Sequence, residues 1–259
     1  MTFRVALAQM ALDPGDLVGN DRKVEDAVGK ASENRADIVL LPELWASGFD
    51  LARTTKYASI LGDGWFARMK ELAVQNEIAI GGSLIEEFQG DYFNTFALYN
   101  DNGELLGSYR KIHLFQMLKE NLHFKPGTEI KIFDSPWGSL GMAICYDLRF
   151  PEIFRSIAVK GAKMVLLVAE WPERRIEHWK TLLQARAIEN QCFIAAVNKT
   201  GSSQGAVLGG CSTVVNPMGD FLVLGDEKEA VLIADIDLDE VARIRRWMPV
   251  FEDRRPDVY

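Results

Sequence analysis

Cysteine and histidine are scarce in this 259-residue sequence, and their scarcity excludes several kinds of site. The three cysteines form an odd, widely spaced set that matches neither a disulfide framework nor a CxxC metal pair. The three histidines, His113, His123 and His178, have no metal-ligand spacing. We therefore expect no disulfide scaffold and no metal, and the reducing cytoplasm is the expected location.

The sequence also lacks a long apolar run, a dinucleotide motif and an excess of basic residues. The longest uninterrupted apolar run, Met164–Ala169, is too short for a membrane span, and no GxGxxG motif occurs. Lysine and arginine total 29 against 37 aspartates and glutamates, which gives a net charge of −8 at pH 7. This balance argues against a nucleic-acid partner, and nothing suggests a membrane partner.

What the chain does contain is an alternation of helix-like and strand-like segments. Apolar residues at helical spacing predict helices over 18–32, 65–76, 151–160, 177–190 and 238–246. Short apolar runs predict strands over 3–9, 38–41, 78–84, 92–99, 104–110, 130–134, 140–144, 164–168, 193–198, 211–215, 221–224 and 231–235. An Asn-Gly pair between the fourth and fifth of these strands predicts a hairpin. With no linker or composition break, we expect one α/β domain over 1–259, with helices outside a mixed sheet system.

Cys145 stands where a predicted strand runs into a helix that begins a few residues later. Such a turn can hold a nucleophile exposed and aim the amide N–H of the next residue, Tyr146, at a developing oxyanion. The alternative is that Cys145 is a small buried hydrophobic residue at a strand end. Cys192 and Cys211 each open an apolar strand-like run, and we expect both to be structural.

Two charged residues, Glu43 and Lys111, also stand at the ends of predicted strands. A carboxylate just after a buried strand is desolvated, which makes Glu43 a usable general base. An inward-facing ammonium at Lys111 could stabilise a thiolate and an oxyanion. For either residue taken alone, an ordinary polar residue at a strand end is the favoured interpretation. His113, two residues after Lys111, raises the possibility of a Cys–His pair.

Taken together, the segments PE, RKIHL and CYDLRFPE, in this order, resemble the nitrilase superfamily of carbon–nitrogen hydrolases. The resemblance covers essentially the whole chain, from VALAQM to VFEDRRPDVY. It implies that Glu43 is the general base, Lys111 the oxyanion-stabilising lysine and Cys145 the nucleophile. It also implies a further catalytic glutamate ahead of a Pro-Gly turn, for which Glu120 is the match, and it leaves His113 with a structural role.

The resemblance also implies a fold, an assembly and a reaction. The fold would be a four-layer α-β-β-α sandwich. The assembly would be a homodimer in which the helix after the nucleophile and the helix over 177–190 face the partner and the C-terminal tail crosses over it. The reaction would be hydrolysis of an amide through a thioester on Cys145, without any cofactor.

Several further segments are similar to the omega-amidase branch of this superfamily: AEWPERR, HW, LLQARAIENQ, STVVNP and IDL. That branch implies a small amide with an anionic end, such as 2-oxoglutaramate. Arg149, Arg174 and Arg175 are the candidate cations for such a carboxylate, although an arginine in this loop could also be merely solvated. Tyr146 and Trp171 are further candidates for the substrate-binding wall.

The Gly-rich segment over 201–208 departs from the branch pattern and leaves the substrate open. The alternatives are an aliphatic amidase, an N-carbamoyl amine hydrolase, an acyl transferase using the same residues, and a non-catalytic binding protein on this fold.

Overall fold

Strand β1 (Thr2–Gln9) shows why the chain builds two separate hydrophobic layers. Successive side chains of a strand point to opposite faces, and nearly all of those in β1 are apolar. Val5 and Leu7 are buried in the layer between two sheets, whereas Ala6 and Ala8 are buried in a layer beneath helices. A strand covered on both faces therefore lies inside a layered structure.

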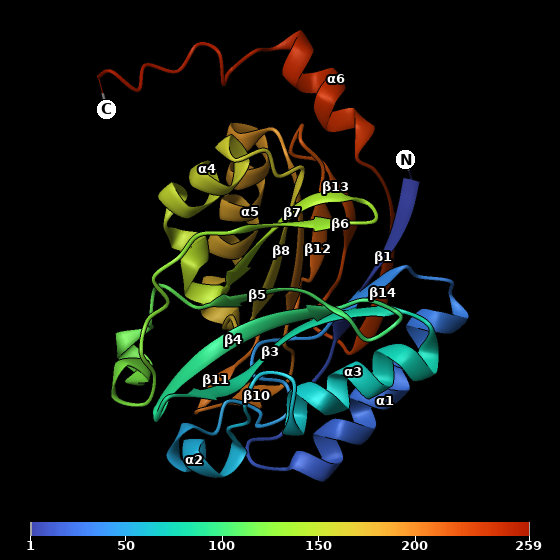
Figure 1. Ribbon diagram of the computed structural model, residues 1–259, viewed down its shortest axis with the longest axis vertical. Helices are drawn as coiled ribbons and strands as arrows, with labels where there is room; N and C mark the ends of the chain where they lie inside the picture. Colours follow the sequence, from blue (N-terminus) through green and yellow to red (C-terminus); the bar gives the residue numbers. More distant parts are fainter. Residues whose placement is uncertain (1, 259) are drawn as a thin grey trace.

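The computed structural model describes residues 2–258 and contains two six-stranded sheets (Figure 1). In the first sheet β1, β2 and β3 are parallel and the outer pairings are antiparallel. Its strand order is β14 (Ala230–Asp237), β1, β2 (Ile38–Leu40), β3 (Ala79–Phe88), β4 (Asp91–Tyr99) and β5 (Leu105–Arg110).

The second sheet has a parallel centre, formed by β7, β8 and β9, with antiparallel strands on either side. Its strand order is β13 (Phe221–Leu224), β12 (Thr213–Val215), β9 (Phe193–Asn198), β8 (Met164–Ala169), β7 (Gly138–Ile144) and β6 (Ile132–Ser135). A separate small hairpin is formed by β10 (Ser202–Ser203) and β11 (Ala206–Val207).

Helices cover the outer faces of both sheets. Helices α1 (Leu17–Glu33) and α3 (Gly64–Asn76) share a core with the first sheet, and α4 (Pro151–Val159) and α5 (Ile176–Asn190) share one with the second. Figure 1 shows the two helix pairs on opposite sides of the stacked sheets. The expected four-layer α-β-β-α sandwich is therefore confirmed.

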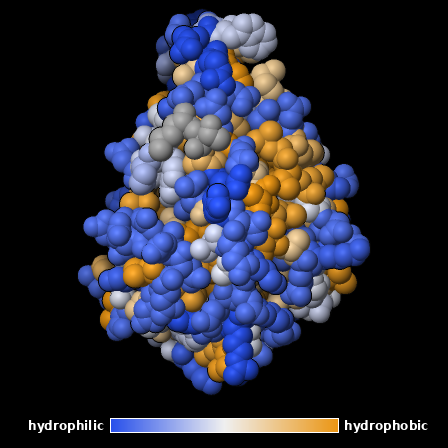
Figure 2. Space-filling model, turned by 90° about the vertical axis from the view of Figure 1, so that its right-hand side faces the viewer, coloured by the Kyte–Doolittle hydropathy of each residue, from blue (hydrophilic) through white to orange (hydrophobic). Residues whose placement is uncertain are grey.

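Two short helices lie outside the layers, α2 (Thr54–Tyr57) and α6 (Asp239–Trp247). The chain after α6 crosses over the end of the molecule at which α4 lies, and Phe251 contacts Arg155 of α4 (Figure 1). Figure 2 views the side of β1, β14 and α6, where most of the surface is hydrophilic and an apolar area lies in the upper half. Within the described part of the chain, no helix combines the length and apolarity needed to cross a membrane.

The predicted segments match the observed elements closely at their centres and differ at their ends. The predicted hairpin is present, with Gly103 at a φ of 78° in the turn between β4 and β5. Strand β3 extends four residues further at its C-terminal end than predicted, because it pairs with β4 all the way to the Gln89–Gly90 turn. Helix α2 and the β10–β11 hairpin were not predicted, because elements of two to four residues carry no detectable periodicity.

The strand predicted over 211–215 begins later than expected. Cys211 has a φ of 54° and stands outside the ladder, which starts at Thr213. Cys192 is fully buried just before β9, in agreement with a structural role. The three cysteines, Cys145, Cys192 and Cys211, are free thiols.

Candidate active site

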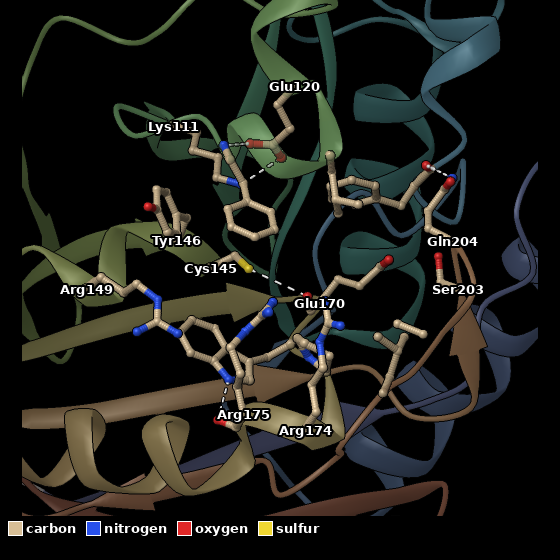
Figure 3. Close-up of a pocket in the computed structure, with 18 residues that line it drawn as sticks. Lys111, Glu120, Cys145, Tyr146, Arg149, Glu170, Arg174, Arg175, Ser203 and Gln204 are labelled. Carbon is tan, nitrogen blue, oxygen red and sulfur yellow. Dashed lines mark hydrogen bonds and ion pairs between the residues drawn. The ribbon is translucent and has the colours of Figure 1, made fainter.

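The charged and nucleophilic residues singled out from the sequence converge where strands of both sheets end. Cys145 directly follows β7, Lys111 directly follows β5, and Glu43 comes three residues after β2. Carboxyl ends of parallel strands meet at one edge of a sheet, and the two sheets present these edges to the same space. Figure 3 shows Cys145 with Lys111 and Glu120 on one side of the resulting pocket.

The backbone at Cys145 is in the left-handed region, with a φ of 44°. Such a conformation is uncommon for a residue with a side chain and is held only by its surroundings. The chain turns here from β7 into a 3₁₀ turn over Cys145–Arg149 and then into α4. The thiol lies 3.7 Å from the carbonyl oxygen of Glu170 and faces the pocket. The expected strand-to-helix elbow is therefore present.

The Lys111 ammonium is completely buried between two carboxylates. Its Nζ lies 2.8 Å from Oε1 of Glu43 and 2.7 Å from Oε1 of Glu120. Both glutamates are fully buried as well. An ammonium has three N–H donors, so these two ion pairs leave one N–H available to a group in the pocket.

Neutral hydrogen-bond donors also hold the carboxylates of Glu43 and Glu120. Glu43 accepts a second hydrogen bond at Oε1 from Nδ2 of Asn94 (2.8 Å) and one at Oε2 from the amide of Glu170 (3.0 Å). Glu120 accepts at Oε2 from the amide of Phe115 (2.6 Å). Buried carboxylates are tolerated when they are paired and hydrogen-bonded in this way, so the positions of both side chains are fixed before substrate binds.

Burial and neighbouring charges control the protonation of this cluster. Burial, together with the charge of Glu43, raises the pKa of Cys145 well above its usual value, with Lys111 acting against them. Burial opposes the charge on Lys111, but Glu120 and Glu43 outweigh it and raise the pKa of that ammonium. Burial also raises the pKa of Glu120 to about 7. The resting thiol is therefore protonated and the lysine is charged.

A second buried ion pair borders the pocket, and the sequence reasoning missed it. Nζ of Lys199 lies 2.6 Å from Oε2 of Glu170, and neither side chain is exposed by more than 3%. Glu170 follows β8 and Lys199 follows β9, two parallel strands paired up to Ala169 and Asn198. Each is a charged residue directly after an apolar strand, the same signal that identified Glu43.

The pocket beside Cys145 has a volume of about 190 Å³. Eight of the nine residues predicted for the site line this pocket: Lys111, Glu120, Cys145, Tyr146, Arg149, Trp171, Arg174 and Arg175. The ninth, Glu43, lies behind Lys111 with no exposed surface. Glu170 and the tip of the β10–β11 hairpin also line the pocket. Among residues 2–258 no group of three or more histidine, cysteine or acidic side chains is placed to hold a metal ion.

Three arginines form the cationic wall of the pocket: Arg149, Arg174 and Arg175. None of them forms an ion pair with a described residue. Arg149 lies over the ring of Trp171 at 4.8 Å, and Arg175 lies 5.5 Å from the ring centre of Phe115. Burial and the neighbouring arginines lower the pKa of Arg175, so an anion bound here would relieve an unfavourable concentration of charge.

His113 lies outside the pocket lining and hydrogen-bonds to Asp147, with its Nδ1 at 3.0 Å from Oδ1. Its ring stacks on Phe150, with ring centres 3.5 Å apart. The alternative of a Cys–His pair is therefore wrong.

Comparison with known proteins agrees along the whole chain. The family model described as carbon-nitrogen hydrolase matches residues 4–246. The chain is 38% identical over 260 residues to the 2-oxoglutaramate amidase of Bacillus subtilis (strain 168), with all of both chains covered. It is 33% identical to the omega-amidase NIT2 of Homo sapiens, covering 100% of this chain and 97% of that one. The structure of XC1258 from Xanthomonas campestris, a CN-hydrolase superfamily protein with an arsenic adduct in its active site, superimposes with a TM-score of 0.89, at 32% identity and 98% coverage of each chain.

Proposed function

The chain belongs to the carbon–nitrogen hydrolase family, in the omega-amidase branch of the nitrilase superfamily, and on this basis we propose that it converts 2-oxoglutaramate and water to 2-oxoglutarate and ammonia. The enzyme acts on carbon–nitrogen bonds other than peptide bonds. The observation that carries the substrate assignment is the wall of three unpaired arginines in the pocket that holds Cys145. A substrate with a carboxylate at one end and an amide at the other fits both features.

Acylation begins with a proton transfer from the Cys145 thiol to Glu43. The thiolate attacks the amide carbon, and the carbonyl oxygen becomes an oxyanion. The free N–H of Lys111 and the amide of Tyr146, in the first turn after the strand where no intrahelical acceptor exists, stabilise this charge. The carbon–nitrogen bond then breaks, and the leaving ammonia takes the proton from Glu43.

Deacylation uses the same groups in the same order. Glu43 removes a proton from water, and the hydroxide attacks the thioester carbon. The second oxyanion is held by the same two donors, and its collapse expels the Cys145 thiolate. Glu43 returns its proton to the thiolate, so the enzyme is regenerated and the products are a carboxylic acid and ammonia. No step requires a cofactor.

Glu120 keeps Lys111 in place during both steps. Without it, the ammonium would pair with Glu43 alone and draw the general base away from the thiol. Its hydrogen bond from Phe115 anchors it to the loop that also lines the pocket.

The deciding experiment measures ammonia release from four substrates: 2-oxoglutaramate, succinamate, a short aliphatic amide and an N-carbamoyl amine. We expect 2-oxoglutaramate to have the highest kcat/KM and Cys145→Ala to abolish its turnover. A preference for a neutral amide with the same mutant inactive would contradict the substrate assignment and leave the chemistry intact. No release from any substrate would favour a non-catalytic role.

We also propose a cytoplasmic homodimer. A reducing compartment keeps the Cys145 thiol available, and all three cysteines are free. Helices α4 and α5 pack side by side and leave apolar side chains exposed at Val159 and Ile188. The tail after α6 is held to this side of the molecule by Phe251, whose ring centre lies 5.3 Å from the guanidinium of Arg155 and 4.8 Å from that of Arg245.

A further inference from the structure

Asp147 is a fully buried carboxylate that stands two residues after the nucleophile and outside the pocket lining. A buried charge without partners is strongly unfavourable, so the hydrogen bonds to this carboxylate are required for the fold. The mechanism above does not use this residue. Its side chain lies between the end of β7, from the second sheet, and the segment around Lys111, which follows β5 of the first sheet.

Four contacts satisfy the Asp147 carboxylate. Oδ2 accepts from the amide of Ile144 at 3.0 Å and from the hydroxyl of Tyr109 at 2.8 Å. Oδ1 accepts from the amide of His113 at 3.0 Å and lies 3.0 Å from its Nδ1. The histidine tautomer that fits this contact carries its proton on Nδ1.

These partners frame both reactive residues. Ile144 is the last residue of β7 and immediately precedes Cys145. Tyr109 and His113 stand two residues before and two residues after Lys111. Because β7 and β5 belong to different sheets, the distance from thiol to ammonium is not set by any strand ladder. The Asp147 carboxylate is a direct polar connection between the two segments.

The network is rigid at each end. Burial and the adjacent carboxylate raise the pKa of Tyr109 far above its usual value, so its hydroxyl remains a donor at any pH the enzyme meets. The His113 ring is stacked on Phe150 with an angle of 5° between the planes. The elbow itself is strained at Cys145 and needs an external restraint.

We propose that Asp147 is a positioning residue that fixes Cys145 relative to Lys111, acting through the Ile144 amide on one side and through Tyr109 and His113 on the other. The proposal rests on the proposed roles of Cys145 and Lys111. Displacing reacting groups by about 1 Å can reduce turnover about 100-fold. Arg174 and Arg175 of the cationic wall belong to another segment, so we expect this network to affect substrate affinity much less than turnover.

The test variant is Asp147→Asn, which keeps the shape but cannot accept hydrogen bonds at both side-chain positions. With 2-oxoglutaramate, kcat should fall about 100-fold while KM stays within about twofold. The rate at which iodoacetamide alkylates Cys145 at pH 8 should fall several-fold, because Lys111 no longer faces the thiolate. Tyr109→Phe removes one of the four contacts and should lower kcat about tenfold, and it keeps the test open if Asp147→Asn does not fold.

The matched control is Glu86→Gln. Glu86 on β3 is also a buried carboxylate, and it binds Thr95 on β4 (2.6 Å) and Arg110 on β5 (2.6 Å) without lining the pocket of Cys145. It should lose stability and keep kcat and the alkylation rate within about twofold of wild type. Equal effects of Asp147→Asn and Glu86→Gln on kcat and alkylation would overturn the proposal. If the wild type does not hydrolyse 2-oxoglutaramate, the substrate assignment fails, and the alkylation rates still decide the role of Asp147.

Discussion

Arg175 carries the clearest electrostatic signature of a bound anion at the scale of single residues. It is half-buried beside two other arginines, and its pKa is lowered by that burial and by their charge. We predict that Arg175→Gln raises KM for 2-oxoglutaramate at least tenfold, because a charge-assisted hydrogen bond contributes about 1.5–3 kcal/mol. Steady-state kinetics with an uncharged amide is the internal control. An equal rise in KM for both substrates would show that the arginine shapes the pocket without binding the carboxylate.

Glu120 makes the stability of the enzyme depend on pH. Its pKa is about 7 in the folded chain, mainly because it is buried, against an ordinary value of 4.5. Between these two values the folded state binds the proton more strongly than the unfolded state, so the free energy of unfolding falls as the pH rises. The loss is complete above pH 7 and amounts to roughly 3 kcal/mol.

Glu120→Gln removes this titration. We predict that the free energy of unfolding of the variant, relative to wild type, rises by roughly 3 kcal/mol between pH 4.5 and pH 7.5. Urea unfolding of both proteins at several pH values in this range measures the difference. A constant difference would mean that Glu120 does not change protonation in this range.

Disruption of the Glu170–Lys199 pair should cost the enzyme substantial stability. Its charges are buried, and removing one partner of such a pair typically costs about 3–5 kcal/mol, because the other charge is left unpaired. We predict this loss for Lys199→Met and recovery of most of it in the double variant Lys199→Met, Glu170→Met. Urea unfolding of the single and double variants checks it, and an equally unstable double variant would contradict it.

The residue scale also shows what the sequence could and could not reveal. Glu43, Lys111 and Cys145 were identifiable because each stands at a strand end in a recognisable segment. Glu170 and Lys199 stand at strand ends too, but nothing in the sequence states that β8 lies between β7 and β9 in one sheet. A residue at a strand end can be assigned to the active site only when the order of the strands in the sheet is known.

At the scale of elements, the β10–β11 hairpin is the least predictable part of the pocket. Its tip, Gln204 and Gly205, has φ angles of 50° and 74°, as a two-residue hairpin turn with the twist of its strands requires. Nε2 of Gln204 donates to the carbonyl oxygen of Phe49 at 3.1 Å and closes the pocket on this side. The Gly-rich composition that departed from the branch pattern therefore serves a tight turn that lines the pocket.

We predict that Gln204→Ala loosens this hairpin and raises KM for 2-oxoglutaramate several-fold, with a small effect on the free energy of unfolding. The hydrogen bond to Phe49 is the reason, since an exposed two-strand hairpin is only marginally stable by itself. Limited proteolysis within 201–207 should be faster in the variant and slower when substrate is present. Ser202→Ala, an exposed position on β10 outside the pocket lining, is the control and should match wild type.

At the scale of the whole molecule, the four layers were expected from the family resemblance, whereas the segment pattern alone predicted one α/β domain with helices outside a mixed sheet system. The physical reason for the layers is that strands with apolar residues on both faces must be covered twice. The surface between copies of the chain is harder to predict, since exposed apolar residues occur on more than one side. Ile188 on α5 is 52% exposed, and Leu222 on β13 is 43% exposed. The two residues are similar in size and exposure but lie on different elements of the second half of the chain, which makes them a matched pair.

We predict a dimer through α4 and α5, in which Ile188 is buried against the partner. Ile188→Glu would place a charge in an apolar interface and should give a monomer at micromolar concentration, whereas Leu222→Glu should remain a dimer. Light scattering during size-exclusion chromatography gives the mass of each variant. The opposite pattern would move the interface to the side of β13, and a monomeric wild type would exclude the dimer.

Since α5 also begins directly after Arg174 and Arg175, we further expect a monomeric Ile188→Glu variant to bind 2-oxoglutaramate less tightly than the dimer does.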